Sequence, residues 1–243
     1  MTRNWNDFFR NPINWVVIVL VALALRNLNT YRLLAGLIVL CTAIPVHEYA
    51  HAWMANQMGD SSARRLKRLS LNPLDHIDPI GALMILFLGF GFARPVPINS
   101  MNFRDRKKGI ILTSLAGPAS NILMALVFMI LHKLLVILFA FLRISAPVVL
   151  IQILWFVVRI NISLAVFNLI PIPPLDGWHA LSQTLPSDVY WKIAPYEQYL
   201  VYFVLFLAMM GVLTGPISAL SNIVYSLLDG MTFFLDVLYR IVR

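Results

Sequence analysis

Long apolar runs constrain this chain most, because a segment that matches the thickness of hydrocarbon can fold in few ways. Three runs exceed the ~20 residues that cross a bilayer as a helix: Leu33–Met58, Ile110–Phe141 and Val148–Ile172. The shorter run Trp15–Leu25 crosses, with its flanking residues, only if it is tilted or if the bilayer thins. Tyr199–Leu213 is predicted to be a further span. The sequence therefore predicts an all-α polytopic membrane protein with about five to six transmembrane helices.

The composition excludes most water-soluble alternatives. The hydrophobic residues make up 60% of the chain and the charged residues 12%, against roughly 45–50% and 25% in soluble domains. The net charge of +8 favours contact with an anionic bilayer surface. We find no basic and aromatic pattern typical of nucleic-acid binding. The single cysteine, Cys41, excludes an intrachain disulfide and a thiolate metal site.

The rest of the chain is organised around these spans. Ile80–Phe92 is bounded by glycines and prolines and is too short to cross comfortably, so it predicts a re-entrant or membrane-edge hairpin. No polar stretch is long enough for a soluble domain, and residues 1–243 are interpreted as one integral membrane domain. Residues 199–243 are predicted to be accessory helices, and Pro216–Arg243 is either an interfacial helix or an imperfect last span.

Basic residues predict the orientation in the membrane. Nine of the 19 Lys and Arg residues lie in two neighbouring loops: Arg64, Arg65, Lys67, Arg68, Arg94, Arg104, Arg106, Lys107 and Lys108. Loops rich in Lys and Arg stay in the cytoplasm. The turn at Arg143 is then expected outside, and the connection Pro173–Tyr196 is expected in the cytoplasm.

Three ionisable residues interrupt the apolar run Leu33–Met58. His47 and His51 are four residues apart and therefore share one face of a helix, with Glu48 beside them. This H-E-x-x-H pattern is typical of two zinc ligands and a general base that activates water. Such residues cost several kcal/mol in hydrocarbon unless they are paired or coordinated. We therefore interpret His47, Glu48 and His51 as a zinc site, with a purely structural polar cluster as the alternative.

A catalytic zinc needs a third protein ligand and one open position. Asp176 is the leading candidate because prolines break the preceding span there and Gly177 permits a turn. Asp75 and Asp78, in a polar loop, are the alternatives. The two histidines lie on the order of 10–15 Å below the cytoplasmic surface at 1.5 Å per residue. Asp176 ends its span at the same face, so the three side chains share one depth.

Two asparagines in apolar runs are further candidates. Asn121 ends the stretch "AGPASN", whose small residues predict close packing against the zinc helix. Its amide is placed to donate a hydrogen bond into the site. Asn168 precedes Asp176 on the same span. Its amide would hold the substrate backbone or stabilise an oxyanion, or alternatively join two helices.

These motifs, taken together, resemble the site-2 protease family of intramembrane zinc metalloproteases, in its compact form without a PDZ domain. The resemblance rests on segments in family order over residues 33–177: "HEYAH", "NPLDHIDPIG", "ARPVPIN", "AGPASN" and "NLIPIPPLDG". It implies a catalytic core at residues 33–177, built of three helices and a short membrane-edge β hairpin near Ile80–Asn99. It also implies one Zn²⁺ held by His47, His51 and Asp176, with Glu48 as the base.

The implied reaction is hydrolysis of peptide bonds within or near the transmembrane segments of membrane-protein substrates. The expected location is a prokaryotic cell membrane, with the active site toward the cytoplasm. The partners would be transmembrane substrates and the lipid bilayer, without nucleic acid, and the oligomeric state is not predicted. One alternative is a catalytically idle relative that binds membrane helices as a chaperone. A transporter is the other, although we see no repeated halves.

Overall fold

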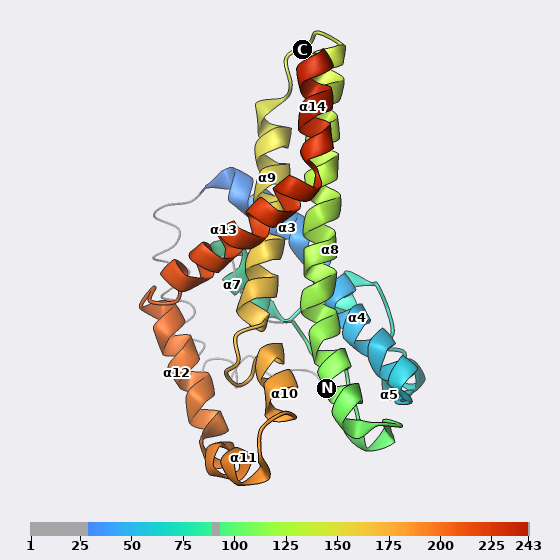
Figure 1. Ribbon diagram of the computed structural model, residues 1–243, viewed down its shortest axis with the longest axis vertical. Coiled ribbons are helices and arrows are strands. Elements are labelled where there is room, and N and C mark those ends of the chain that lie inside the picture. The colour runs from blue at the N-terminus through green and yellow to red at the C-terminus, as the bar shows by residue number, and fades with distance from the viewer. Residues whose placement is uncertain (1–28, 89–92, 243) are drawn as a thin grey trace.

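A computed structural model describes residues 29–88 and 93–242 (Figure 1). Within these residues the secondary structure is entirely helical, and no strand occurs. The helices are α3 Thr30–Cys41, α4 Ala43–Met58, α5 Ser62–Arg65, α6 Pro73–His76, α7 Pro79–Leu88, η2 Ser100–Asn102, α8 Arg106–Phe141, α9 Val148–Asn168, α10 Asp176–Ser182, α11 Ser187–Ile193, η3 Ala194–Tyr196, α12 Glu197–Met209, α13 Thr214–Met231 and α14 Phe233–Val242.

Three of the described helical segments are long and apolar enough to cross a membrane: Thr30–Met58, α8 and α9. These are the three long spans predicted from the sequence. A fourth is counted only if α13 and α14, bent by 57° at their junction, form one span. The run Tyr199–Leu213 forms α12, which ends at Met209 and is short for a crossing. The described residues therefore hold three or four spans. The expected span Trp15–Leu25 lies outside the described residues.

The span Thr30–Met58 is two helices rather than one. α3 ends at Cys41, and Thr42 has non-helical backbone angles before α4 begins at Ala43. Pro45 explains the break, because its ring clashes with the carbonyl four residues earlier and it has no N–H to donate. The Thr42 side chain caps the end of α3 by donating to the Ile38 carbonyl at 2.6 Å. The break directly precedes α4, the helix that carries both histidines.

The predicted β hairpin over Ile80–Asn99 is wrong in the part that is described. Pro79–Leu88 is a helix, α7, and residues 93–99 belong to neither a helix nor a strand. Asp78 starts α7 by accepting the amides of Ile80 and Gly81 at 3.0 and 3.2 Å, and Pro79 suits the first helical position. A short apolar run does not distinguish a helix from a strand. In this chain the N-terminal cap formed by Asp78 favours the helix.

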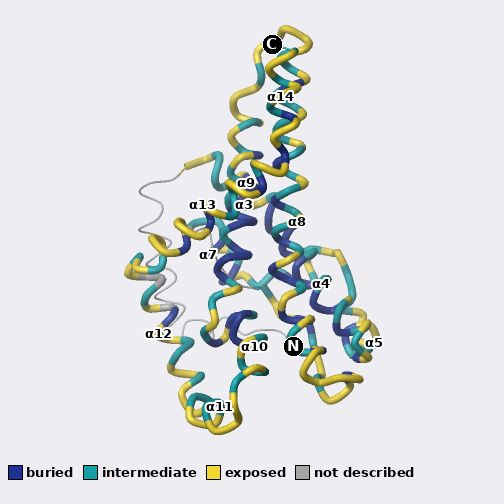
Figure 2. Tube along the Cα trace, in the orientation of Figure 1, coloured by how far each residue is buried: buried dark blue, intermediate teal, exposed yellow. Residues whose placement is uncertain are grey.

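α9 lies at the centre of the packing. One face contributes Val158, Ile162 and Val166 to a buried cluster with α8, α12 and α13. The opposite face contributes Val157, Ile160 and Leu164 to a second cluster with α3, α4 and α7. A helix that is apolar all round is expected to be buried on several sides. Figure 2 shows this burial in the lower part of α9, and more exposed residues at the upper ends of α8, α9 and α14. Several of the exposed residues there are apolar, among them Phe141, Val148 and Ile241.

The C-terminal helices return to α8 through a charged cluster. Lys133 Nζ lies 2.8 Å from Asp229 and 2.6 Å from Asp236. The Lys133 side chain is 11% exposed, so the two carboxylates provide the partners that a largely buried ammonium needs. α14 therefore packs along the upper part of α8 (Figure 1).

Candidate metal centre

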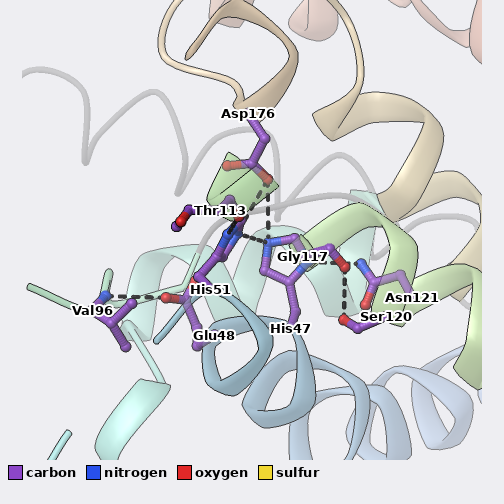
Figure 3. Close-up of polar contacts among 9 residues, drawn as sticks. All are labelled: His47, Glu48, His51, Val96, Thr113, Gly117, Ser120, Asn121 and Asp176. Carbon is purple, nitrogen blue, oxygen red and sulfur yellow. Dashed lines mark hydrogen bonds and ion pairs between the residues drawn. The ribbon is translucent and has the colours of Figure 1, made fainter. Parts of the chain in front are cut away.

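The two histidines of α4 converge on one point. His47 and His51 lie one helical turn apart and are both buried. Their Nε2 atoms are 3.0 Å apart, with the rings close to perpendicular (Figure 3). The helix pattern in the sequence therefore corresponds to a real pair of donors that face the same space.

Asp176 reaches this pair from a segment more than 100 residues later in the chain. It is the first residue of α10, after the proline-rich turn that follows α9. Gly177 lets the start of α10 pack closely against the end of α9, because a Cβ at this position would overlap the backbone carbonyl of Leu169. Asp176 Oδ2 lies 3.4 Å from Nε2 of His47 and 3.4 Å from Nε2 of His51. These three residues are the cluster of described side chains suited to hold a metal ion.

The spacing of the three donor atoms fits zinc. Donors about 2 Å from one tetrahedral Zn²⁺ stand about 3.3 Å from one another, which matches the three separations above. Asp176 Oδ2 is buried and has no hydrogen-bond partner among the described residues, as expected of an atom that binds a cation. A carboxylate binds a metal ion in its ionised form, as a ligand at this position would have to.

The other ring nitrogen of each histidine contacts α8. His51 Nδ1 donates to the Thr113 carbonyl at 2.7 Å, which leaves the Nε2 lone pair for a metal. His47 Nδ1 lies 3.2 Å from Nδ2 of Asn121. Asn121 Oδ1 is buried without a partner, and rotating the amide by 180° would let this oxygen accept from His47 Nδ1–H. Both contacts would then hold the rings with Nε2 toward Asp176.

Gly117 allows α8 to approach the pair. A Cβ at this position would overlap Nε2 of His51 and Cε1 of His47. The prediction that the "AGPASN" stretch packs against the zinc helix is confirmed by this contact. Small residues let helix backbones approach closely in membranes, and here the approach brings Thr113 and Asn121 to the rings.

Glu48 lies beside the three donors and is not one of them. It is buried, and its Oε2 accepts a hydrogen bond from the Val96 amide at 3.1 Å (Figure 3). Val96 belongs to the irregular segment 93–99, so the carboxylate is held by a part of the chain other than α4 and α8. The sequence placed Glu48 next to the histidines but contained no signal for its backbone partner.

A cavity of about 750 Å³ opens on this centre. It is lined by the three donor residues and Glu48, and also by both predicted asparagines, Asn121 and Asn168. Gln183, Tyr190 and Glu197 also line it. The alternative ligands Asp75 and Asp78 are not in the donor cluster, and Asp78 instead caps α7.

Asp60, which the sequence analysis did not single out, joins the segments around the centre. Its carboxylate is 1% exposed and accepts four hydrogen bonds: from the amides of Ser62 and Asn99 and from the side chains of Ser62 and Asn102. Burial opposes ionisation, but these donors lower the pKa of Asp60 below its ordinary value. The end of α4 is thereby tied to the segment that leads from Val96 to α8.

Comparison with known proteins assigns this arrangement to a family. A family model described as peptidase family M50 matches residues 135–212, a stretch that contains Asn168 and Asp176. Relatives named "Putative zinc metalloprotease" include the following three. YwhC of Bacillus subtilis is 37% identical over 179 residues, which cover 72% of this chain and 80% of that protein. Rip2 of Mycolicibacterium smegmatis is 32% identical over 160 residues, covering 63% and 58%.

Rip2 of Mycobacterium tuberculosis (strain H37Rv) is 29% identical over 180 residues, covering 70% of this chain and 64% of that protein. No solved structure matches the chain. The chain belongs to peptidase family M50, the site-2 protease family of zinc metalloproteases.

Proposed function

We propose that this protein is an intramembrane zinc metalloprotease that hydrolyses peptide bonds within or near transmembrane segments of membrane-protein substrates. The observation that carries the proposal is the convergence of His47, His51 and Asp176 at zinc-ligand spacing, with Glu48 beside them in one cavity. Two of these donors sit on a helix long and apolar enough to cross a membrane. A soluble peptidase would have no need to place them there.

The residues divide the chemistry among them. His47, His51 and Asp176 would hold one Zn²⁺, which when bound acts as a Lewis acid and makes water a nucleophile near neutral pH. Glu48, outside the donor set, would take a proton from the attacking water and pass it to the leaving amine. The Asn168 amide, at the end of α9 and on the cavity wall, would hold the substrate backbone or the developing oxyanion.

Asn121 is better suited to hold His47 than to bind substrate. It is fully buried and its amide faces His47 Nδ1, although it also lines part of the cavity. The contact would fix the ring orientation of a zinc ligand, a role that is common for the hydrogen-bond partner of a ligating histidine.

The spans and their charges support a proposal for the location of the site. We propose that the basic loops after α4 and before α8 face the cytoplasm of a prokaryotic cell, so that the cavity opens toward that side. The partners would be transmembrane proteins and the bilayer itself. A substrate helix hides its peptide bonds in internal hydrogen bonds, and the polar cavity lining offers groups that replace them once the helix is unwound.

Cleavage of a model transmembrane substrate by the purified protein tests the proposal. The wild type is expected to bind about one zinc per chain and to cleave, whereas Glu48→Gln keeps the zinc and loses about 10²–10⁴-fold in rate. Asp188→Asn, which changes an exposed carboxylate on α11, is the matched control and should cleave as the wild type does. Equal cleavage by Glu48→Gln would contradict the mechanism. Zinc without cleavage by the wild type would favour the idle relative.

A further inference from the structure

The carboxylate of Glu48 is held by one backbone amide of an unusual segment. Val96 lies between Pro95 and Pro97, and a proline has no amide hydrogen. The Val96 N–H is therefore the only backbone donor of this tripeptide, and it donates to Glu48 Oε2 at 3.1 Å. Val96 is 8% exposed, so water does not readily replace this bond.

The carbonyl end of the same peptide group is held by Arg68. Its Nη2 donates to the carbonyls of Arg94 and Pro95 at 3.0 and 3.2 Å, and its Nη1 donates to the carbonyl of Asp75. One guanidinium thus joins the segment 94–96 to α6, the short helix that precedes α7. A guanidinium suits this role because its donors lie in one rigid plane.

The backbone of Arg68 is itself fixed. Its amide donates to the Ala63 carbonyl at 2.8 Å. The preceding residue, Lys67, has a φ of 55°, which is the left-handed region that a lysine rarely adopts. The turn therefore aims the Arg68 side chain at the segment 94–96 instead of leaving it free in solution.

Arg68 and Glu48 bind opposite ends of a single planar unit. The Pro95 carbonyl and the Val96 N–H belong to one peptide group, whose atoms lie in a plane and cannot rotate independently. Fixing the oxygen therefore fixes the direction of the N–H. The positive charge at the oxygen also polarises the group and strengthens the N–H as a donor to the carboxylate.

We propose that Arg68 is a positioning residue for Glu48, acting through the peptide group between Pro95 and Val96. The proposal rests on the proposed function in that Glu48 is taken as the general base. Any basic residue near Arg68 would serve equally well to orient the chain in the membrane. The proposal gives Arg68 a second role that depends on its particular contacts.

Amide hydrogen exchange at Val96 tests the contact without any need for cleavage. In the full-length protein labelled with ¹⁵N-valine, Glu48→Ala is expected to speed exchange of the Val96 amide about fivefold or more, as the loss of one hydrogen bond allows. Arg68→Lys, which keeps the positive charge but removes the planar guanidinium with its several donors, is expected to speed exchange of the Val96 amide similarly. Arg64→Lys, an exposed change in the same loop, should leave it unchanged. Unchanged exchange in Arg68→Lys would overturn the proposal.

A double variant distinguishes loss of this one contact from a general loss of structure. Adding Arg68→Lys to Glu48→Ala should produce no further acceleration at Val96, because the bond is already lost. A further large acceleration would contradict a shared path through the peptide group.

Kinetics and zinc content give the second readout. Arg68→Lys is expected to lower kcat for a model transmembrane substrate roughly 10- to 100-fold, the cost of a slightly misplaced catalytic group, with KM and zinc content unchanged. Loss of zinc together with cleavage would overturn the proposal, since the effect would then fall on the ligands. If the wild type does not cleave at all, the proposed function fails, and the exchange measurement still decides the role of Arg68.

Discussion

Gly117 shows at the scale of one residue how much of the metal centre depends on the absence of a side chain. The glycine lies on α8 against both histidine rings. Its neighbours on the same helix, Thr113 and Asn121, provide the hydrogen-bond partners of those rings. The small size of Gly117 lets α8 approach the histidines, and this approach also brings Thr113 and Asn121 within reach of the rings.

Replacing Gly117 by Ala is expected to lower the zinc affinity about 10- to 100-fold, the usual cost of disturbing the support of metal ligands. The added Cβ would overlap His51 and His47, so either the rings or α8 must move. Zinc titration of the purified protein measures this effect. Gly230→Ala is the matched control, because its Cβ meets no atom within 4 Å, and it should bind zinc normally. Normal affinity in Gly117→Ala would show that the contact is not needed.

At the scale of the elements, the structure depends on how irregular segments attach to the helices. Arg68 and Asp60 attach the segment 93–102 to the region after α4 through backbone and side-chain hydrogen bonds. Sequence patterns identify helices by their apolar period, but extended segments with prolines have no comparable period. The helices α3, α4, α8 and α9 were therefore predictable, whereas the path of residues 93–102 was not.

The Asp60 network predicts a dependence of stability on pH. Its folded-state pKa lies below the unfolded value of about 3.9. The stabilisation is therefore complete above that value and is lost as the pH falls below about 4 toward the folded pKa. At pH 7, Asp60→Asn is expected to lower the free energy of unfolding by roughly 1–3 kcal/mol. The difference between the two proteins should shrink on acidification, as thermal unfolding in detergent would show.

The exposed change Asp188→Asn should follow the wild type at every pH. A constant gap between the wild type and Asp60→Asn down to pH 3 would contradict the assignment of the lowered pKa to the Asp60 network.

At the scale of the whole molecule, the length of α8 is informative. Its 36 residues extend about 54 Å at 1.5 Å per residue, against a hydrocarbon thickness of about 30 Å. The metal centre lies near the beginning of this helix, at Thr113 to Asn121, and the exposed apolar ends of α8, α9 and α14 lie at the other (Figure 1). The polar cavity and the projecting apolar end are thus on opposite sides of the molecule.

The proposed orientation predicts which loops are reached from outside the cell. In a Cys41→Ser background, Ser145→Cys, between α8 and α9, should react with a membrane-impermeant maleimide on intact cells. Ser187→Cys, at the start of α11, should react only after permeabilisation. Both serines are exposed in the structure, so local burial does not explain a difference. The reverse pattern would place the metal centre toward the outer face.

The sequence by itself determined what depends on local spacing and composition. Of the five to six spans predicted from the apolar runs, the three long ones are present in the structure. The four-residue spacing aligned His47 with His51, and the broken helix after Asn168 singled out Asp176. Tertiary structure decided that Asp176 meets the histidine pair, that α7 is a helix, that the Val96 amide donates to Glu48, and that Arg68 donates to the Pro95 carbonyl. The physical reason is that most of these contacts use backbone N–H or C=O groups. Every residue carries the same C=O group, and every residue except proline carries the same N–H group, so the residue type does not reveal which group is used. Only the packing of distant segments selects which of them is used.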